Sequence, residues 1–355
     1  MRKPTPVSAQ VVVVIGASSG MGRLAALRFS RAGAKVVVAA RNGAALDTLV
    51  REIENTGGEA VAFTADVADF QQVKAVADGA VKRFGRIDTW VNFAATSVYA
   101  EVKDTTPEEF SRVVQVNLCG QANGAMAALP HLGRVHSGAL IFISSVEGEV
   151  SMPYHSAYAA SKHGLNGFID ALRIELAHEK SPVRVTTVMP TGVNTPFFNN
   201  ARTRLGVKPK PPRPIYRPEH VADVVLYAAE NHGRDFFVGG AAKMFVIGNR
   251  WMPRVVEAYL QSSMFRAQRT NVPKSDEDPS ALFASETGDS RIQGDYTPIA
   301  RRRSAYVWLQ THPLAYAMIK GFVLLVGAAF IEQYCRRNCS PSWEERAERR
   351  LRDLL

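Results

Sequence analysis

The sequence has few cysteines and no recognisable export signal. Its three cysteines, Cys119, Cys335 and Cys339, are too few and too scattered for a disulfide framework or a metal site. The amino terminus reaches a strand-like run at residues 11–15 without the longer apolar stretch and small-residue cleavage site of a secretory signal. We therefore expect a cytoplasmic protein that holds no metal.

Acidic residues are outnumbered by basic ones. The chain has 33 Asp and Glu against 43 Lys and Arg, which gives a formal charge of +10. A basic balance favours anionic partners such as phosphorylated cofactors, acidic lipids or nucleic acids. The sequence has no segment in which aromatic and basic residues interleave as they do in nucleic-acid recognition modules. We therefore expect no nucleic-acid partner.

Short runs rich in β-branched residues alternate with longer amphipathic stretches from residue 11 to about residue 247. This alternation is typical of an α/β fold, a Rossmann-like doubly wound parallel sheet with helices on both faces. The continuous apolar character of the short runs indicates strands buried on both faces. We expect strands at residues 11–15, 35–39, 60–64, 89–93, 140–144, 184–189 and 243–247. We expect helices at residues 23–31, 45–55, 71–83 and 107–129.

A glycine-rich turn joins the first expected strand to the first expected helix. Its amide groups and the helix N-terminus can face a pyrophosphate. The residues expected to contact this group are Gly16, Ser18, Ser19, Gly20, Met21 and Gly22. The alternative is an ordinary glycine-rich loop. The spacing differs from the G-x-G-x-x-G fingerprint, and it resembles the G-x-x-x-G-x-G turn of short-chain dehydrogenases.

The end of the second expected strand distinguishes between nicotinamide cofactors. In dinucleotide folds an acidic side chain at this point holds the free 2′-hydroxyl of the adenosine ribose. The sequence has Ala40 and Arg41 instead, and a guanidinium matches a 2′-phosphate. We therefore expect NADP(H), with a solvated surface arginine as the alternative. Asp66 and Val67 resemble the family's adenine-contacting pair, although Asp66 is otherwise a helix cap.

Tyr158 and Lys162 lie four residues apart, on one face of an expected helix. A nearby ammonium favours the phenolate, so we expect the phenol to exchange its proton nearer to neutral pH. The spacing alone also occurs by chance on solvated helices. Together with Ser145 and Asn117, however, it resembles the catalytic tetrad of the family. The resemblance implies that Ser145, or its neighbour Ser144, polarises the substrate oxygen and that Asn117 completes a proton relay.

Two further segments resemble the family's cofactor wall. The segment that ends at Thr195 is similar to the family's P-G-x-V-x-T motif, which holds the nicotinamide carboxamide. Asn92 lies where the family usually reads N-N-A-G. The resemblance implies cofactor contacts for Thr195 and Asn92. Thr191, Phe93 and Ala95 depart from these patterns, which leaves the details of the wall open.

The motifs follow one another in the order of the short-chain dehydrogenase/reductase family over about two thirds of the chain. The resemblance implies an NADP(H)-dependent oxidoreductase that interconverts a carbonyl and an alcohol on a hydrophobic small molecule. Hydride would pass between nicotinamide and substrate carbon while Tyr158 exchanges a proton with the substrate oxygen. The alternative is a non-catalytic NADP(H)-sensing or scaffold protein tethered by its C-terminus. Relatives commonly form dimers and tetramers, so we expect a homo-oligomer.

The remaining sequence suggests three parts. We expect an NADP(H)-binding catalytic domain at residues 1–250, a helix and polar linker at 251–304, and an apolar helix with a charged tail at 305–355. Within the first part, the proline-rich stretch 197–216 lies where the family carries its substrate lid, with a passive surface loop as the alternative.

Two segments near the C-terminus differ sharply in polarity. The polar stretch at residues 271–303 is interpreted as a linker or a loosely ordered segment. The apolar run at residues 314–331 approaches the length of a membrane span, although it contains Lys320. We therefore consider membrane attachment through this run. The alternative is a helix that covers the domain or a partner subunit.

Overall fold

The computed structural model describes residues 4–135, 137–285, 290–338 and 350–353. The chain divides into two compact units, Met1–Val307 and Trp308–Leu355. Residues 251–304, which we expected to form a separate helix and linker, belong to the first unit.

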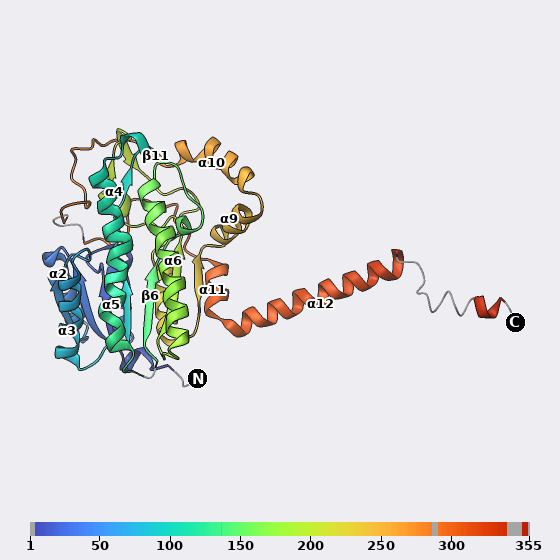
Figure 1. The fold of residues 1–355 in the computed structure, drawn as a ribbon, viewed down its shortest axis with the longest axis horizontal. Coiled ribbons are helices and arrows are strands. Elements are labelled where there is room, and N and C mark those ends of the chain that lie inside the picture. The colour runs from blue at the N-terminus through green and yellow to red at the C-terminus, as the bar shows by residue number, and fades with distance from the viewer. Residues whose placement is uncertain (1–3, 136, 286–289, 339–349, 354–355) are drawn as a thin grey trace. The chain divides into compact units, whose positions relative to one another are not determined.

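The core of the first unit is a parallel sheet of seven strands in the order β10-β7-β6-β4-β1-β2-β3 (Figure 1). The strands are β1 (Val11–Ile15), β2 (Lys35–Ala40), β3 (Ala60–Thr64), β4 (Thr89–Asn92), β6 (Ala139–Ile143), β7 (Arg184–Pro190) and β10 (Asp235–Val238). Every residue of β1, β4 and β6 is buried, as their apolar sequences indicate. The strand order reverses between β1 and β4, which confirms the doubly wound arrangement.

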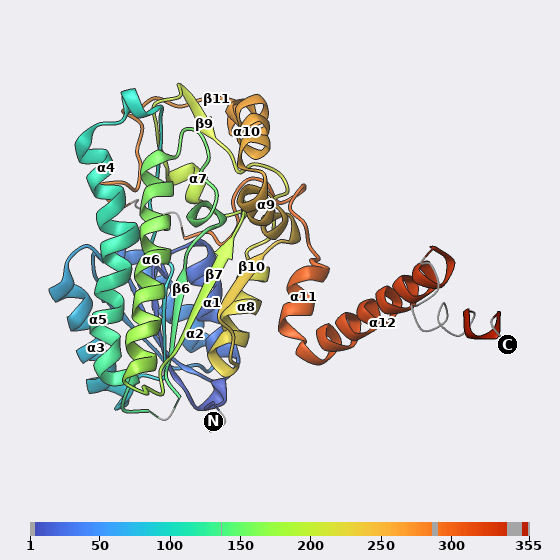
Figure 2. The same ribbon diagram turned by 45° about the vertical axis from the view of Figure 1, so that its right-hand side comes forward.

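Helices cover both faces of the sheet. One face carries α1 (Gly20–Arg31), α2 (Gly43–Asn55) and α8 (Glu219–Glu230). The other carries α3 (Phe70–Phe84), α5 (Gly120–Leu132) and α6 (Ser156–His178). Figures 1 and 2 show α5 and α6 side by side along this second face. An apolar core therefore packs against each face of the sheet, and this packing fixes the positions of the strand ends.

The helix expected at residues 107–129 is interrupted. It consists of α4 (Pro107–Val114), a π-helical turn (Gln115–Cys119) and α5. Thr106 and Glu109 form a capping box at the start of α4, which explains its sharp beginning. Single π-turns inside helices are frequent at functional sites.

The prediction of a strand at residues 243–247 is wrong. These residues lie in α9 (Gly240–Trp251), and the last strand of the sheet is β10, eight residues earlier in the chain. Gly239 has a φ of +118°, a conformation open to glycine, and it separates β10 from the helix. A short apolar run does not distinguish a strand from a helix by periodicity, and this one follows the helical pattern.

Irregular segments cover the carboxyl ends of the strands. They contain β5 (Val98–Tyr99), α7 (Phe197–Asn200), β8 (Arg202–Thr203), β9 (Val207–Pro209), α10 (Pro253–Ala267) and β11 (Arg269–Pro273). β5 pairs with β8, and β9 pairs with β11, so distant parts of the sequence close over one end of the sheet. Figure 2 shows α7, β9 and α10 at this end.

The segment at residues 271–303 is packed in its described parts, contrary to the expected loose linker. Leu282 is fully buried. The side-chain oxygen of Asn194 accepts a hydrogen bond from the Tyr296 amide at 2.9 Å, and its nitrogen donates to Thr297 Oγ1 at 3.0 Å. A polar sequence is ordered here because its backbone and side chains find hydrogen-bond partners on the catalytic core.

The second unit contains α12 (Pro313–Asn338). Its residues Pro313–Tyr334 have a mean hydropathy of 2.1 and are long enough to cross a membrane. This stretch includes the apolar run expected at residues 314–331. The short helix α11 (Ala305–Thr311) lies at the boundary of the two units.

Candidate active site

A cavity of about 310 Å³ lies at the carboxyl ends of the parallel strands. The predicted site residues that line it are Gly16, Ser18, Ser19, Gly20, Met21, Gly22, Arg41, Asp66, Val67, Ser145, Tyr158, Lys162 and Thr195. Asn92 and Asn117 are not among its lining residues. The fold thus brings residues from many separate parts of the sequence into one site, as ligand sites of open α/β sheets require.

The glycine-rich turn has the geometry of a phosphate cradle. Gly16 has a φ of +77°, and a Cβ atom there would lie 2.5 Å from the Ala94 nitrogen. A Cβ atom on Gly22 would lie 2.2 Å from the Gly16 carbonyl oxygen, so α1 packs against the turn only with glycine at this position. The turn therefore presents backbone and the N-terminus of α1 to the cavity, which fits a dinucleotide pyrophosphate.

Residues 281–283 and Arg291 contact two of the predicted cofactor ligands. The Arg41 guanidinium donates to the carbonyl oxygens of Ala281 and Phe283, the latter at 3.2 Å. The Gly20 amide donates to the carbonyl oxygen of Arg291 at 2.8 Å. Arg41 is therefore not a solvated surface arginine, because it joins β2 to the covering segment.

Arg112 supplies a second guanidinium near Arg41. It lies 2.5 Å from the Asp66 carboxylate and donates to the Leu282 carbonyl oxygen at 3.1 Å. Burial lowers the pKa of Arg41, and the like charge of Arg112 lowers it further. Two cationic groups beside one carboxylate leave net positive charge at this end of the cavity, which suits an anionic ligand.

Asp66 does not cap a helix, which was the alternative to its cofactor role. Asp69 caps α3 instead, and Asp66 accepts a hydrogen bond from the Ala68 amide at 3.0 Å. Partial burial opposes ionisation of Asp66, but this hydrogen bond and the contact with Arg112 outweigh it and hold its pKa below the ordinary value. The carboxylate, which lines the cavity, is thus ionised and orients Arg112 behind it.

Tyr158 is buried and hydrogen-bonded to Ser145 at the cavity wall. Burial raises the pKa of its phenol well above 10, the charge of Glu147 raises it further, and the bond with Ser145 opposes both effects. The acidic phenol that we expected from the Tyr158–Lys162 spacing is therefore not present. Desolvation is the larger influence here because the group is removed from water.

Lys162 lies beside Tyr158, as its position one helical turn later requires. Its Nζ is 5.5 Å from the centroid of the phenol ring and donates to the Ile143 carbonyl oxygen at 2.8 Å. Burial lowers the pKa of the ammonium to about 7, against the opposing charge of Glu147. The protonation state of Lys162 therefore changes close to neutral pH.

The two predicted asparagines lie behind the cavity wall. Asn117 is fully buried in the π-helical turn, where its side chain bonds both the amide and the carbonyl of Thr96 and donates to Ser161 Oγ at 3.2 Å. Asn92 bonds the Gly120 carbonyl and the Ala94 amide. In this structure both side chains hold the backbone that surrounds the site.

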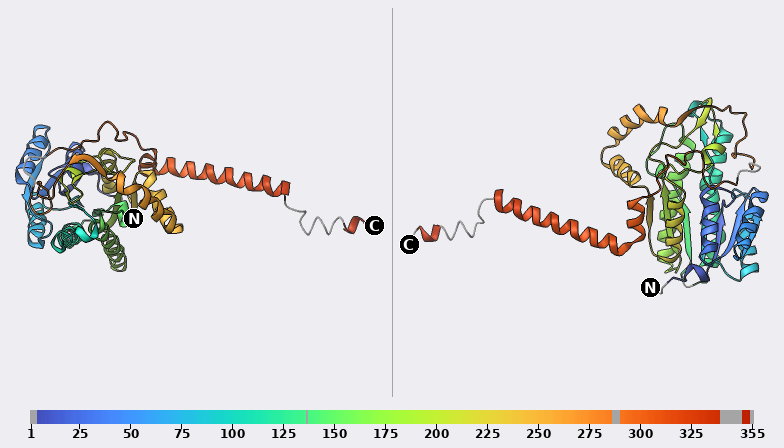
Figure 3. Two further views of the ribbon diagram at one scale, coloured as in Figure 1. Left: turned by 90° about the horizontal axis from the view of Figure 1, so that it is seen from above. Right: turned by 180° about the vertical axis from the view of Figure 1, so that it is seen from behind.

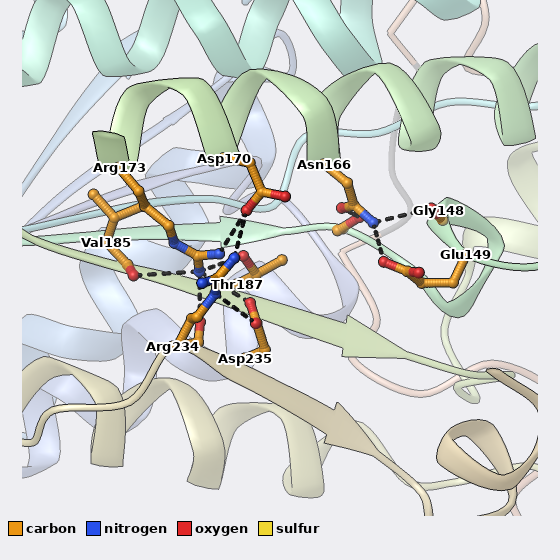
Figure 4. A network of polar contacts seen from close by, with 10 residues as sticks. Gly148, Glu149, Asn166, Asp170, Arg173, Val185, Thr187, Arg234 and Asp235 are labelled. Atoms are coloured by element: carbon orange, nitrogen blue, oxygen red, sulfur yellow. Dashed lines mark hydrogen bonds and ion pairs between the residues drawn. The ribbon is translucent and has the colours of Figure 1, made fainter. Parts of the chain in front are cut away.

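A polar network fixes α6, which carries Tyr158 and Lys162, against the sheet (Figure 4). On α6, Arg173 donates to Thr187 Oγ1 of β7 at 2.9 Å and pairs with Asp235 of β10 at 3.0 Å. Nearer the site, Asn166 donates to the Gly148 carbonyl oxygen at 3.0 Å. The helix is therefore anchored at two points that both lie C-terminal to Tyr158.

Ser144 is part of this anchoring. Its hydroxyl donates to Asn166 Oδ1 at 2.7 Å, whereas Ser145 bonds Tyr158. The structure therefore favours Ser145 over Ser144 as the residue that contacts a substrate oxygen.

Sequence reasoning missed a chain of polar side chains beside Tyr158. Ser97, His155 and Glu147 are buried and line the cavity. His155 Nε2 lies 2.5 Å from Ser97 Oγ, and its Nδ1 lies 3.0 Å from both carboxylate oxygens of Glu147. The one signal in the sequence is the spacing of three residues between His155 and Tyr158, which places them on one side of a helix start.

The rest of the cavity wall is largely apolar. The residues concerned are Val150, Met152, Phe197, Phe198, Phe245, Leu260 and Met264. Phe197 and Phe198 come from the proline-rich stretch, which therefore lines the cavity and is not a passive loop. Phe245, Leu260 and Met264 come from α9 and α10, which the sequence analysis did not assign to the site.

Comparison with known proteins identifies relatives. Residues 10–206 match the family model described as short chain dehydrogenase. The chain is 35% identical over 322 residues to the uncharacterized oxidoreductase YxnA of Bacillus subtilis, covering 90% of each protein. It is 36% identical over 204 residues to dehydrogenase/reductase SDR family member 7B of Bos taurus, covering 56% of this chain and 62% of the bovine protein.

A solved structure shares the fold. It is an alcohol dehydrogenase from the archaeon Thermococcus sibiricus in complex with 5-hydroxy-NADP. The TM-score is 0.57 at 24% identity, over 64% of this chain and 95% of the archaeal chain. The matched family model spans the phosphate-binding turn and the Ser145, Tyr158 and Lys162 set, and the chain therefore belongs to the short-chain dehydrogenase/reductase family of oxidoreductases.

Proposed function

We propose that the chain is an NADP(H)-dependent reductase or dehydrogenase that interconverts a carbonyl and an alcohol on a hydrophobic small molecule. The observation that carries the proposal is the contact of Tyr158 with Ser145 in the wall of a cavity that also contains the phosphate-binding turn. A sensing or scaffold protein has no need of this proton-transfer pair, so the pair favours catalysis over that alternative.

Tyr158, Ser145 and Lys162 have separate roles in the proposed reaction. A bound nicotinamide supplies the hydride in reduction and accepts it in oxidation. Tyr158 carries the proton that the substrate oxygen takes up, and its raised pKa keeps it protonated at neutral pH, as reduction requires. Ser145 orients the same oxygen through its hydroxyl. Lys162 lies beside the phenol ring and donates to the Ile143 carbonyl oxygen, a position from which it would hold the cofactor's ribose end.

The preference for NADP(H) rests on the charges at the adenosine end. Arg41 follows Ala40 at the end of β2, so the strand end itself contributes no carboxylate at the expected 2′-phosphate position. Arg112 adds a second guanidinium nearby. A 2′-phosphate would compete with the carbonyl oxygens of residues 281–283 for Arg41, and its greater charge makes it the stronger acceptor.

Membrane attachment through α12 and a cytoplasmic catalytic unit are part of the same proposal. The mean hydropathy and length of Pro313–Tyr334 support a span, and family membership supports a homo-oligomer. Fractionation of cells that express the full-length chain tests the attachment. Recovery of all the protein in the soluble fraction without detergent contradicts it.

The activity is tested by following NADPH oxidation across a panel of apolar ketones with the wild-type protein and the Tyr158→Phe variant. The phenol oxygen has one described side-chain contact, to Ser145, so the variant is expected to fold. Loss of a general acid lowers kcat by about 10²- to 10⁴-fold. A variant that keeps near-native turnover on a ketone reduced by the wild type contradicts the assignment.

A further inference from the structure

α9 and α10 have an apolar outer surface as well as an apolar inner one. Their inner residues, among them Phe245, Leu260 and Met264, line the cavity. Their outer residues Met244, Ile247, Trp251, Met252, Val255 and Tyr259 are all exposed. Trp251 is 79% exposed and Val255 62% exposed. Exposed large apolar side chains that are gathered on neighbouring helices mark an interaction surface, whereas single ones do not.

The outer residues form one continuous stripe. Met244, Ile247 and Trp251 recur at the spacing of one helical face on α9, and Val255 and Tyr259 do so on α10, while Met252 lies in the joint between the helices. The two helices contact each other and are joined at Met252. Figure 3 shows the two helices next to each other on the first unit. We call this stripe the α9–α10 face.

Basic side chains flank the α9–α10 face. Lys243, Arg250 and Arg254 are exposed on the two helices, where Glu257 is the one exposed acid. Within the described part of the chain, none of the three basic groups has a carboxylate at ion-pair distance. An apolar stripe with a tryptophan and a basic border is the pattern of helices that lie in the interface of an anionic membrane.

The same charges disfavour a second copy of this chain as the occupant. A twofold interface between copies uses the same face on both, so it would bring two sets of Lys243, Arg250 and Arg254 into one interface. Like charges across an interface oppose association, whereas anionic lipid headgroups pair with all three.

Tyr259 connects this face with the cavity. It belongs to the exposed stripe, yet it also lines the cavity, and its ring contacts that of Phe245 in a tilted arrangement with centroids 5.5 Å apart. The cavity therefore reaches the surface at the α9–α10 face. An apolar molecule leaving a bilayer that touches this face would meet the apolar end of the cavity first.

We propose that the α9–α10 face docks on the surface of an anionic phospholipid bilayer and that apolar substrate enters the cavity from the lipid beside Tyr259. The docking is independent of the reaction, whereas the entry route rests on the proposed function.

Docking is tested in the full-length chain with its three cysteines replaced by serine. A single cysteine is introduced by Val255→Cys, or by Ile174→Cys on α6 as the control, since Ile174 is 72% exposed and lies outside the face. Each carries an environment-sensitive fluorophore and is mixed with vesicles of phosphatidylcholine, with or without phosphatidylserine. We expect a blue shift at position 255 that requires phosphatidylserine, and no shift at position 174.

Three outcomes overturn the docking proposal. One is a label at position 255 that stays in water while the protein sediments with the vesicles. Another is an equal response at positions 255 and 174. The third is a label already shielded before vesicles are added, which would mean that another copy or another part of the chain covers the face.

Charge variants test the electrostatic part and the entry route. Lys243→Gln with Arg254→Gln removes two basic groups, so the phosphatidylserine concentration needed for the shift is expected to rise about thirtyfold. For a ketone embedded in these vesicles, KM rises in the double variant, while kcat on a water-soluble ketone is unchanged. An unchanged KM overturns the entry route. If no ketone is reduced at all, the fluorescence result still decides the docking.

Discussion

The imidazole ring of His155 is stacked on the phenol ring of Tyr158, with ring centroids 4.7 Å apart and planes inclined by 20°. Glu147 accepts a hydrogen bond from Nδ1 of the same imidazole. A carboxylate, a histidine and the proposed proton donor therefore lie in contact in one buried series. In a site removed from water, charges at this range act strongly on one another. The acidity of Tyr158 therefore depends on residues that the family motif does not contain.

Replacing Glu147 with Gln is expected to lower the pKa of Tyr158, since the negative charge of Glu147 is second to burial among the causes that raise it. Reduction needs the protonated phenol, so its rate will begin to fall at a lower pH than in the wild type. Oxidation needs the phenolate, so its activity will extend to a lower pH. The pH profiles of kcat in both directions measure the effect, with Glu149→Gln as an exposed control. Unchanged pH profiles would show that Glu147 does not affect the pKa of Tyr158.

The two adjacent serines are expected to behave differently. Ser145→Ala removes the hydroxyl that contacts Tyr158 and lowers kcat by about tenfold to hundredfold, the effect of one lost hydrogen bond to a polar group. Ser144→Ala removes a bond to Asn166 and mainly lowers the melting temperature. Kinetics and thermal unfolding of the two variants decide between these roles. A larger loss of kcat in Ser144→Ala would reverse the assignment.

Arg41→Ala is expected to lower kcat/KM for NADPH by about tenfold to hundredfold, because a charge-assisted contact to the 2′-phosphate is lost. The value for NADH should change little. Arg51→Ala, on the exposed side of α2, is the control. If both cofactors lose equally and the melting temperature falls, then Arg41 serves only to hold residues 281–283.

Asp295 is expected to make stability depend on pH. Its hydrogen bond with Lys208 is the main cause that lowers its pKa to about 2, against partial burial. Because the pKa of Asp295 is lower in the folded state than in the unfolded state, the ionised group stabilises the fold above about pH 4. This stabilisation is lost as the pH falls through about 2. Because Asp295 is half-exposed, we expect the contribution to be about 1 kcal/mol. The melting temperatures of wild type and Asp295→Asn should differ at pH 6 and converge near pH 2; a constant difference would contradict this prediction.

Local sequence was sufficient for the elements with a strong pattern. The positions of strands β1, β2, β3, β6 and β7 agree closely with the prediction, because continuous apolar runs between helical stretches have few other stable arrangements. Of these strands, β3 is only partly buried. The turn from Gly16 to Gly22 was predictable for the same reason, since its glycines are required by the backbone itself. The run at residues 243–247 failed because its short apolar pattern fits a helix as well as a strand.

The covering segments were not predictable in this way. Residues 271–303 are polar and carry no periodicity, and the order of their described parts depends on partners such as Asn194 and Arg41 that lie far away in the chain. Likewise, the placement of Phe245 and Leu260 in the cavity wall depends on how α9 and α10 pack.

The sequence by itself determined the fold class, the phosphate-binding turn and the order of Ser145, Tyr158 and Lys162, because these depend on local backbone geometry and on spacing along one helix. Only the tertiary structure decided that the phenol is less acidic than its ordinary value, that Glu147 and His155 stand beside it, and that Arg41 is engaged by carbonyl oxygens. Burial and charge at a buried group arise from elements that are distant in the chain, so no local pattern contains them.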